Sequence, residues 1–389
     1  MDNRRKKSIA VIFGTRPEVI KLYPVIRRLR ALRKTGCMVI ATGQQREMQL
    51  QMQKTLGLTV DHDLGIMKRD QKLPGLSARL IRELSITISQ LKPDMVLVQG
   101  DTTTAFCGAL SAYYQKIPVG HIEAGLRTGK MYQPFPEEAN RKLISALSEL
   151  HFAPTRKAGQ TLLNENVPKN RIFVTGNTVI DTLHLILERL DRNNLEETAE
   201  LKVIREKTRG KRILLVTGHR RESFGEGLSN ICRALKKIVG IAADTAIVYP
   251  VHLNPNVRRP VHDLIGNTPG IHLTASLDYI SFISLLKDSF LVLTDSGGIQ
   301  EEATALGKPT LIMRDTTERT EAVNCGAARL VGTSEDSIIK NAIELLTDDA
   351  AYKKMATPRD VFGKGDAAVK IVNGCLSFIN HEFEFNESW

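Results

Sequence analysis

Short apolar runs rich in β-branched residues alternate with amphipathic stretches along the whole chain, and this alternation constrains the fold more than any other feature. Strands that are apolar throughout and separated by helices indicate parallel sheets covered on both faces. Right-handed crossovers between such strands lead to doubly wound α/β folds. The predicted strands are 9–13, 38–42, 95–99, 119–122 and 171–175 in a first series, and 213–217, 246–249, 290–294, 310–313 and 329–331 in a second.

The two series of strands predict two domains. A chain of 389 residues exceeds the roughly 250–300 residues at which a single core stops growing. The stretch 188–211 between the series is charged and poor in strands, so we expect one or two exposed helices and a turn there. A helix over 366–378 can pack back on either half. We therefore predict an N-terminal Rossmann-like domain of residues 1–175 with 366–389, and a C-terminal one of residues 176–365.

The net charge of +11 raises the question of a nucleic-acid partner, but most of it lies in one place. Residues 1–36 hold eleven basic and two acidic residues. In the helix predicted over 22–32, Arg27 and Arg30 lie on the face opposite Leu22 and Leu29, as is typical of a solvated surface. Aromatic residues make up only 5% of the chain, which also argues against binding of single strands. We predict no nucleic-acid partner.

The sequence predicts a cytoplasmic protein without membrane insertion. No uninterrupted apolar stretch approaches the ~20 residues that cross a bilayer. The apolar run 9–13 behind the basic start is too short for a signal peptide. The five cysteines are odd in number and contain no C-x-x-C pair, so we expect neither a disulfide framework nor a zinc site.

Polar residues follow the predicted strands of the first half. Ligands bind beyond the carboxyl ends of the strands in open parallel sheets. The segment GTRPE at 14–18 places Arg16 at a helix N-terminus, which favours anions, and Lys21 one turn further on. Either an ordinary turn with a surface arginine or a phosphate site accounts for this segment, and we favour the phosphate site.

Three acids follow the next strands of the same half. Asp101 and Glu123 each come after a strand, and Glu137 opens a helix on which Arg141 lies four residues further along the same face. Any one segment could be a surface ion pair or a turn carboxylate. Three acids at one sheet edge fit proton transfer at a sugar better, with one as base and one as acid.

The second half carries a different motif, DSGGIQEEA at 295–303. Ser296 can cap the helix, and Gly297 and Gly298 let a phosphate approach the free N–H groups. Glu301 and Glu302 follow in the first two turns, where a carboxylate can accept both hydroxyls of a ribose. His219 follows the first strand of this half and fits a pyrophosphate contact or a proton donor. Neither G-x-G-x-x-G nor a P-loop is present, so we expect no nicotinamide or ATP site, and no cofactor or metal.

Taken together, these segments resemble one known family. The matching segments, in order from residue 8 to about 375, are FGTRPE with Lys21, QGDTTT, GHIEAGLRTG, PEEANR, TGNTVID, TGHRRESFG, YPVHLNPNV, TDSGGIQEEA and RDTTER. Nine segments in register are similar to the non-hydrolysing UDP-N-acetylglucosamine 2-epimerases. The resemblance implies a glycosyltransferase-B-like fold of two Rossmann-like domains facing a central cleft, in a homodimer. It also implies an isomerase that interconverts UDP-N-acetylglucosamine and UDP-N-acetylmannosamine, through anti elimination of UDP to 2-acetamidoglucal and re-addition, for cell-surface polysaccharide.

The resemblance also implies roles for individual residues. Asp101, Glu123 and Glu137 are candidate acid and base groups, supported by Arg141, and His219 joins the catalytic set. The residues implied to bind substrate are Arg16, Lys21, Asp101, Glu123, His219, Leu277, Phe282, Ser296, Gly297, Gly298, Glu302 and Arg319. Three positions depart from the usual pattern: Gln45 replaces a histidine, Thr320 a proline and Leu277 a glutamine. The sequence leaves two alternatives open: a hydrolysing epimerase that releases N-acetylmannosamine and UDP, and a glycosyltransferase of the same fold.

Overall fold

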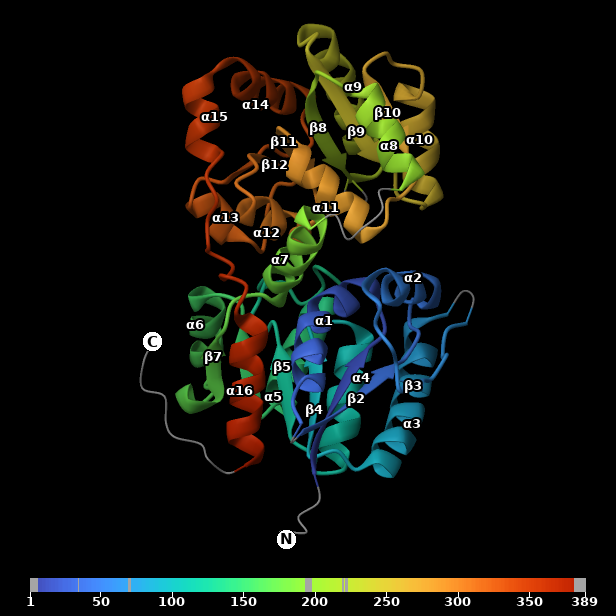
Figure 1. The fold of residues 1–389 in the computed structure, drawn as a ribbon, viewed down its shortest axis with the longest axis vertical. Helices are drawn as coiled ribbons and strands as arrows, with labels where there is room; N and C mark the ends of the chain where they lie inside the picture. The colour runs from blue at the N-terminus through green and yellow to red at the C-terminus, as the bar shows by residue number, and fades with distance from the viewer. Residues whose placement is uncertain are drawn as a thin grey trace. The chain divides into compact units, whose positions relative to one another are not determined.

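The chain forms two compact α/β units (Figure 1). The computed structural model describes residues 6–33, 35–68, 71–192, 198–218, 220 and 223–380. Unit 1 takes the residues up to Thr182 and those from Gly363 onward, and unit 2 takes Leu183–Phe362. Unit 2 is therefore one continuous stretch, whereas unit 1 is built from two separate stretches of sequence.

Unit 1 is built on a seven-stranded parallel sheet with the order β3-β2-β1-β4-β5-β6-β7. Ala10 and Ile12 of β1, the strand beside the central β4, pack in one hydrophobic cluster with α3 (Leu73–Leu91), α4 (Thr103–Tyr114) and α5 (Glu137–Leu147). Because side chains alternate along a strand, Ile9 and Val11 face the other way, and they are fully buried as well. Helices thus cover both faces. The strands are β1 (Lys7–Phe13), β2 (Thr35–Ala41), β3 (His62–Asp63), β4 (Met95–Gln99), β5 (Val119–Ile122), β6 (Leu150–Ala153) and β7 (Ile172–Val174).

The last helix of the chain belongs to unit 1, where α16 lies beside α1 (Figure 1). The carboxylate of Asp181 accepts hydrogen bonds from the N–H groups of Ala367 (3.3 Å) and Ala368 (2.8 Å) and so holds the start of α16. The helices of this unit are α1 (Arg16–Arg30), α2 (Arg46–Leu56), α3 (Leu73–Leu91), α4 (Thr103–Tyr114), α5 (Glu137–Leu147), α6 (Arg156–Asn164), a 3-10 turn (Lys169–Arg171) and α16 (Ala367–Ile379), while α7 (Thr178–Asp191) runs on into unit 2.

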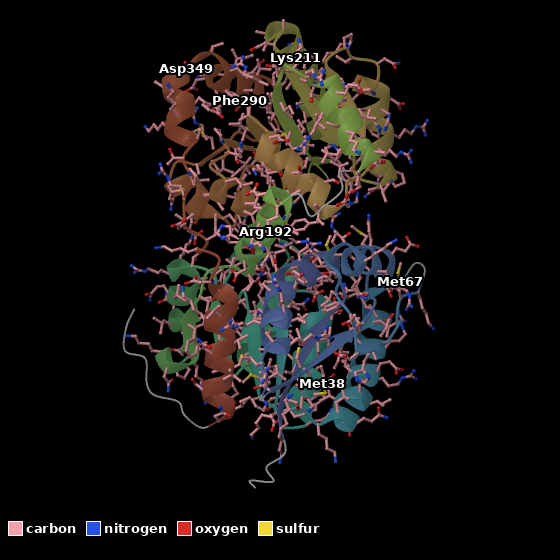
Figure 2. The ribbon with its side chains drawn as sticks, viewed as in Figure 1. Met38, Met67, Arg192, Lys211, Phe290 and Asp349 are labelled. Atoms are coloured by element: carbon pink, nitrogen blue, oxygen red, sulfur yellow. The ribbon has the colours of Figure 1, made fainter. Side chains whose placement is uncertain are left out.

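Unit 2 has a six-stranded parallel sheet with the order β10-β9-β8-β11-β12-β13. Phe290 is labelled in Figure 2. Its ring stacks on that of Tyr352 with centroids 4.0 Å apart, and the guanidinium of Arg212 lies 5.0 Å from the Phe290 centroid. The strands are β8 (Arg212–Thr217), β9 (Thr245–Pro250), β10 (Ile271–Thr274), β11 (Leu291–Thr294), β12 (Thr310–Ile312) and β13 (Ala328–Leu330). The helices are α8 (Ala199–Lys207), α9 (Glu226–Ile241), α10 (Pro255–Ile265), α11 (Tyr279–Asp288), α12 (Gly297–Ala305), α13 (Thr320–Asn324), α14 (Glu335–Thr347) and α15 (Asp349–Met355).

The predicted α/β class with two parallel sheets is confirmed. In α1, Leu22 and Leu29 are fully buried while Arg27 and Arg30 are exposed, so the basic stretch of this helix is a solvated face. The charged stretch 188–211 holds the end of α7 and then α8, although residues 193–197 lie outside the described residues. All five cysteines are free thiols. None of the described helices combines the length and the apolar character needed to cross a membrane.

Candidate active site

Lys21 and Glu123 meet at the carboxyl edge of the unit 1 sheet. The Nζ atom of Lys21 donates to Oε2 of Glu123, and Nε2 of Gln99 donates to the same oxygen. Glu123 directly follows β5 and has φ = +65°, a left-handed conformation that is uncommon for residues other than glycine and that clusters at functional sites. The carboxylate is thus held by Gln99 at the end of β4 and by Lys21 in α1.

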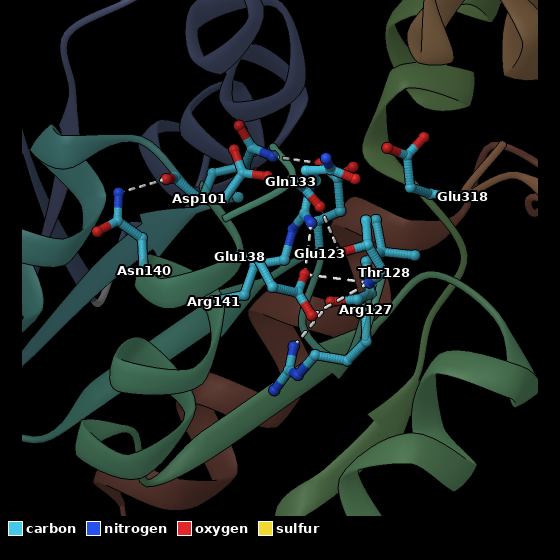
Figure 3. A network of polar contacts seen from close by, with 12 residues as sticks. Asp101, Glu123, Arg127, Thr128, Gln133, Glu138, Asn140, Arg141 and Glu318 are labelled. Atoms are coloured by element: carbon cyan, nitrogen blue, oxygen red, sulfur yellow. Dashed lines mark hydrogen bonds and ion pairs between the residues drawn. The ribbon is translucent and has the colours of Figure 1, made fainter. Parts of the chain in front are cut away.

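Asp101 lies in the turn after β4 and is held by α5 (Figure 3). Arg141 donates from Nη2 to Oδ2 of Asp101 at 2.6 Å, and Asn140 donates from Nδ2 to the Asp101 carbonyl at 2.8 Å. The Asp101 side chain is 28% exposed, whereas that of Arg141 is 8% exposed. The carboxylate therefore has a fixed orientation and still meets solvent, as a group that exchanges protons with a ligand must.

Glu138 holds the guanidinium of Arg141 in place. Its carboxylate is completely buried and accepts from Nη1 of Arg141 at 2.8 Å and from the N–H groups of Thr128 and Gly129, each at 3.1 Å (Figure 3). Burial alone would raise the pKa of Glu138, but these hydrogen bonds outweigh it and lower the pKa below its ordinary value. Glu138 is therefore a buried anion that orients the guanidinium bound to Asp101.

Asp101 and Glu123 come from neighbouring strands and lie close together. β4 pairs with both β1 and β5, so the turns after these three strands share one edge. A Cβ atom placed on Gly100, the residue before Asp101, would lie 4.0 Å from Oε2 of Glu123. Arg16 and Glu137 are the first residues of α1 and α5, and both are half-buried. Unit 1 thus gathers two carboxylates, each paired with a cation, an arrangement suited to acid–base chemistry.

In unit 2, the N-terminus of α12 follows β11. Ser296 is the residue before the helix, but its side chain accepts no hydrogen bond from the helix N–H groups, so the predicted serine cap is wrong. Its N–H donates instead to Oγ1 of Thr294 at 3.0 Å. Among the described residues, no atom beyond its chain neighbours and its own helix backbone lies within 4 Å of a Cβ placed on Gly298, so this part of the backbone leaves room for an anion.

Arg319 lies against the start of the same helix. A Cβ on Gly297 would come within 3.3 Å of the Arg319 Cζ atom. The Nε atom of Arg319 donates to Oε1 of Glu301 at 2.7 Å, and both side chains are buried. Glycine at 297 therefore leaves room for the Arg319 guanidinium beside the start of α12.

Glu302 and Tyr279 form a second buried contact in unit 2, because the Tyr279 hydroxyl donates to Oε1 of Glu302 at 2.6 Å. Leu277 and Phe282 are 3% and 8% exposed, and they lie one residue before and four residues after Asp278, the N-cap of α11. These are the positions of a hydrophobic staple, so helix packing already accounts for two apolar residues there. Their predicted contact with a uracil ring stays a prediction.

His219 lies outside the described residues, so its predicted role stays a prediction. The neighbouring Arg220 donates from its N–H to Oδ2 of Asp295 at 2.8 Å. Asp295 directly precedes Ser296, so the turn after β8 is tied to the turn after β11.

Three polar residues of these clusters were missed from the sequence. Gln99 is the last residue of β4 and looks like part of an apolar strand. Glu138 and Tyr279 lie in helices, where the sequence does not indicate that they are buried against Arg141 and Glu302. Only the position of Gln99, directly before Gly100 and Asp101, could have signalled a role.

Comparison with known proteins identifies one family over most of the chain. Residues 27–375 match the family model described as UDP-N-acetylglucosamine 2-epimerase. The UDP-N-acetylglucosamine 2-epimerase of Escherichia coli K12 is 46% identical over 367 residues, covering 94% of this chain and 97% of that protein.

Two solved structures are similar over almost the whole chain. The epimerase of Neisseria meningitidis bound to UDP-GlcNAc superposes with a TM-score of 0.89 at 43% identity, covering 95% of this chain and all of the other. A complex of S. aureus MnaA with UDP gives a TM-score of 0.90 at 39% identity, with 98% and 100% covered.

Proposed function

The chain belongs to the UDP-N-acetylglucosamine 2-epimerase family, and from this premise we propose that it interconverts UDP-N-acetylglucosamine and UDP-N-acetylmannosamine by eliminating and re-adding UDP. It is an isomerase with a glycosyltransferase-B-like α/β fold. The sugar C2–H has no adjacent carbonyl to acidify it. Removal of this proton becomes feasible when the C1–O bond to UDP breaks in the same reaction.

The proposed reaction balances as follows. A base takes the proton from C2, the C2–H electron pair forms the C1=C2 double bond of 2-acetamidoglucal, and UDP leaves C1 with the C1–O pair. A proton then returns to C2 from the opposite face, and a phosphate oxygen of UDP re-forms the bond to C1. This sequence inverts C2 without an oxidant or a reductant.

We assign the proton transfers to the unit 1 cluster. Asp101 and Glu123 are the acid and base candidates, with Glu137 at the start of α5 as a third carboxylate. The proposal is supported by the ion pairs of Asp101 with Arg141 and of Glu123 with Lys21. Each ion pair fixes the orientation of its carboxylate, as transfer of a proton to or from a bound sugar requires. Arg16, at the N-terminus of α1, is proposed to contact the diphosphate.

We assign the binding of UDP to unit 2. The open N-terminus of α12 at Gly298 and the guanidinium of Arg319 can stabilise the negative charge that develops on the leaving diphosphate. Glu302 is proposed to accept the ribose hydroxyls, and the hydrogen bond from Tyr279 would hold its carboxylate in place. Ser296 and Gly297 line the same helix end.

The observation that carries this proposal is the buried Lys21–Glu123 pair beside the Asp101 turn, within a chain of this family. The test is incubation with UDP-N-acetylglucosamine in heavy water, followed by proton NMR. We expect UDP-N-acetylmannosamine to form and the C2 proton signal to disappear from both sugars. Accumulation of free N-acetylmannosamine would instead indicate hydrolysis of the glycal.

We further propose that the enzyme works in the cytoplasm as a homodimer, as the family resemblance implies. The mass in solution, measured by light scattering, is then expected to be twice the 43.2 kDa of one chain. A mass of one chain at micromolar concentration would contradict the dimer.

A further inference from the structure

Glu18 is a buried carboxylate in the first turn of α1, and its side chain holds the turn that contains Arg16. It is 1% exposed. Its Oε2 atom accepts from Gly14 N at 3.0 Å, from Thr15 N at 2.8 Å and from Thr15 Oγ1 at 2.7 Å. The contact with Thr15 N is half of a capping box, because Thr15 is the N-cap of α1 and Glu18 its third residue. Helix capping therefore accounts for one oxygen of Glu18.

The other oxygen binds a different turn. Oε1 of Glu18 accepts from Oγ1 of Thr102 at 2.7 Å. Thr102 is the N-cap of α4, and its Oγ1 also accepts from Ala105 N at 2.9 Å. It is 84 residues away from Glu18 and directly follows Asp101. Capping of α1 does not require this contact, so helix capping does not account for the second oxygen of Glu18.

The two turns that Glu18 joins are packed directly against each other. A Cβ on Gly14 would collide with the hydroxyls of Thr42 and Thr104, and Thr104 is in the first turn of α4. Asn140 and Arg141 of α5 also hold the carbonyl and the carboxylate of Asp101. The Asp101 turn is therefore fixed both by α5 and by the contact of Glu18 with Thr102.

Burial of a carboxylate costs free energy unless hydrogen bonds compensate it. Burial raises the pKa of Glu18 to about 7, even though the donors of Thr102, Thr15 and Gly14 oppose this rise. A cap alone could be made by an exposed glutamate or glutamine at lower cost. The buried carboxylate is explained by the link between the two turns.

We propose that Glu18 is a positioning residue for the epimerisation: it fixes the turn of Asp101 relative to the turn of Arg16. Glu18 itself touches no reacting atom. This inference rests on the proposed function, because it assigns Asp101 to proton transfer and Arg16 to the diphosphate. Loss of the link would leave both turns present and let them move by a fraction of an ångström. Such displacements reduce the chemical step far more than they reduce binding.

The test is a double-mutant cycle on Glu18→Gln and Thr102→Val, read as kcat, KM and the dissociation constant of UDP. We expect each single variant to lower kcat at least about tenfold and to change the UDP constant less than about twofold. The double variant should be no slower than the slower single, because both changes break one link. Thr102→Ser, which keeps the hydroxyl, should restore kcat.

Thr155→Val is the matched control. Thr155 is the N-cap of α6, with Oγ1 accepting from Ala158 N at 3.1 Å, so its replacement removes a threonine cap in the same unit. We expect its kcat to stay within about twofold of the wild type. If the wild type epimerises but Glu18→Gln and Thr102→Val keep normal kcat, or their effects add, the positioning role is wrong. If the wild type does not epimerise, the proposed function fails and this inference fails with it.

Discussion

Lys21 and Glu123 form an ion pair whose side chains are only 10% and 5% exposed, although 102 residues separate them along the chain. Lys21 lies in α1, which follows β1, and Glu123 follows β5, which is separated from β1 in the sheet by β4. Breaking a buried pair by removing one partner is strongly destabilising, because the remaining charge stays buried without its counter-charge. A variant that lacks both charges should therefore be more stable than one that lacks a single charge, although neither should be active.

Lys21→Met should lower the free energy of unfolding by about 3 kcal/mol, since it leaves the Glu123 carboxylate uncompensated. The double variant Lys21→Met with Glu123→Gln should recover most of that loss, because both charges are then gone. Neither variant should turn over substrate. Urea denaturation near neutral pH measures the stability, and a double variant as unstable as the single one would show that the pair is not the cause.

Asp101→Asn should bind UDP normally and turn over at least ~100-fold more slowly, because the amide cannot exchange the proton. Glu123→Gln should behave in the same way. The matched control is Asp94→Asn, in which the changed carboxylate precedes the same strand β4 and accepts from Ser8 N at 2.8 Å. Its turnover should match the wild type. Near-normal turnover of both active-site variants would mean that another group is the base.

Gly297→Ala and Gly298→Ala should separate packing from ligand binding at α12. At 297 the new methyl group presses on the Arg319 guanidinium, so we expect a loss of stability of about 1 kcal/mol. At 298 the methyl group meets no atom of the part of the chain that the structure describes, and alanine favours the helix, so stability should hold or rise while UDP binds less tightly. Calorimetric titration with UDP checks this, and unchanged affinity of Gly298→Ala would argue against a phosphate at the helix end.

Glu18 should make stability fall as pH rises. Its pKa in the folded chain is about 7 against an ordinary value of 4.5, because burial disfavours the charged form. Between these values the unfolded chain releases the proton while the folded chain keeps it, so the free energy of unfolding decreases by roughly 3 kcal/mol in total. Glu18→Gln lacks this contribution. The stability difference between wild type and variant should change by that amount from pH 4.5 to 7.5, and parallel pH curves would contradict it.

The strand-end turns could be predicted from the sequence because their signals are local. GTRPE, QGD and DSGG combine glycine, a helix start and a charged residue within a few positions, and the structure has β1, β4 and β11 directly before them. The short strands β3, β6 and β10 were not predicted. They have two to four residues and are fixed by pairing with neighbouring strands rather than by their own pattern.

The contacts between distant side chains could not be predicted for a different reason. The sequence pairs Glu137 with Arg141 by helical spacing, but the buried partner of Arg141 on that helix is Glu138, three residues away. Which of two adjacent glutamates is buried depends on the turn at Thr128 and Gly129, which donates to Glu138 from outside the helix. Tertiary packing, and not helical spacing, therefore determines which glutamate pairs with Arg141.

The return of α16 to unit 1 has a consequence for how the chain can be cut. Unit 2, Leu183–Phe362, is one continuous stretch and can be separated as a single fragment. Unit 1, which carries Asp101 and Glu123, needs both of its separate stretches of sequence. Shortening the chain from its C-terminal end would first remove the contacts of α16 with Asp181 and α1. These contacts support the unit that carries Asp101 and Glu123, although α16 is far from both acids in the sequence. A deletion from about residue 370 onward should therefore lower the rate of proton transfer before it lowers the affinity for UDP.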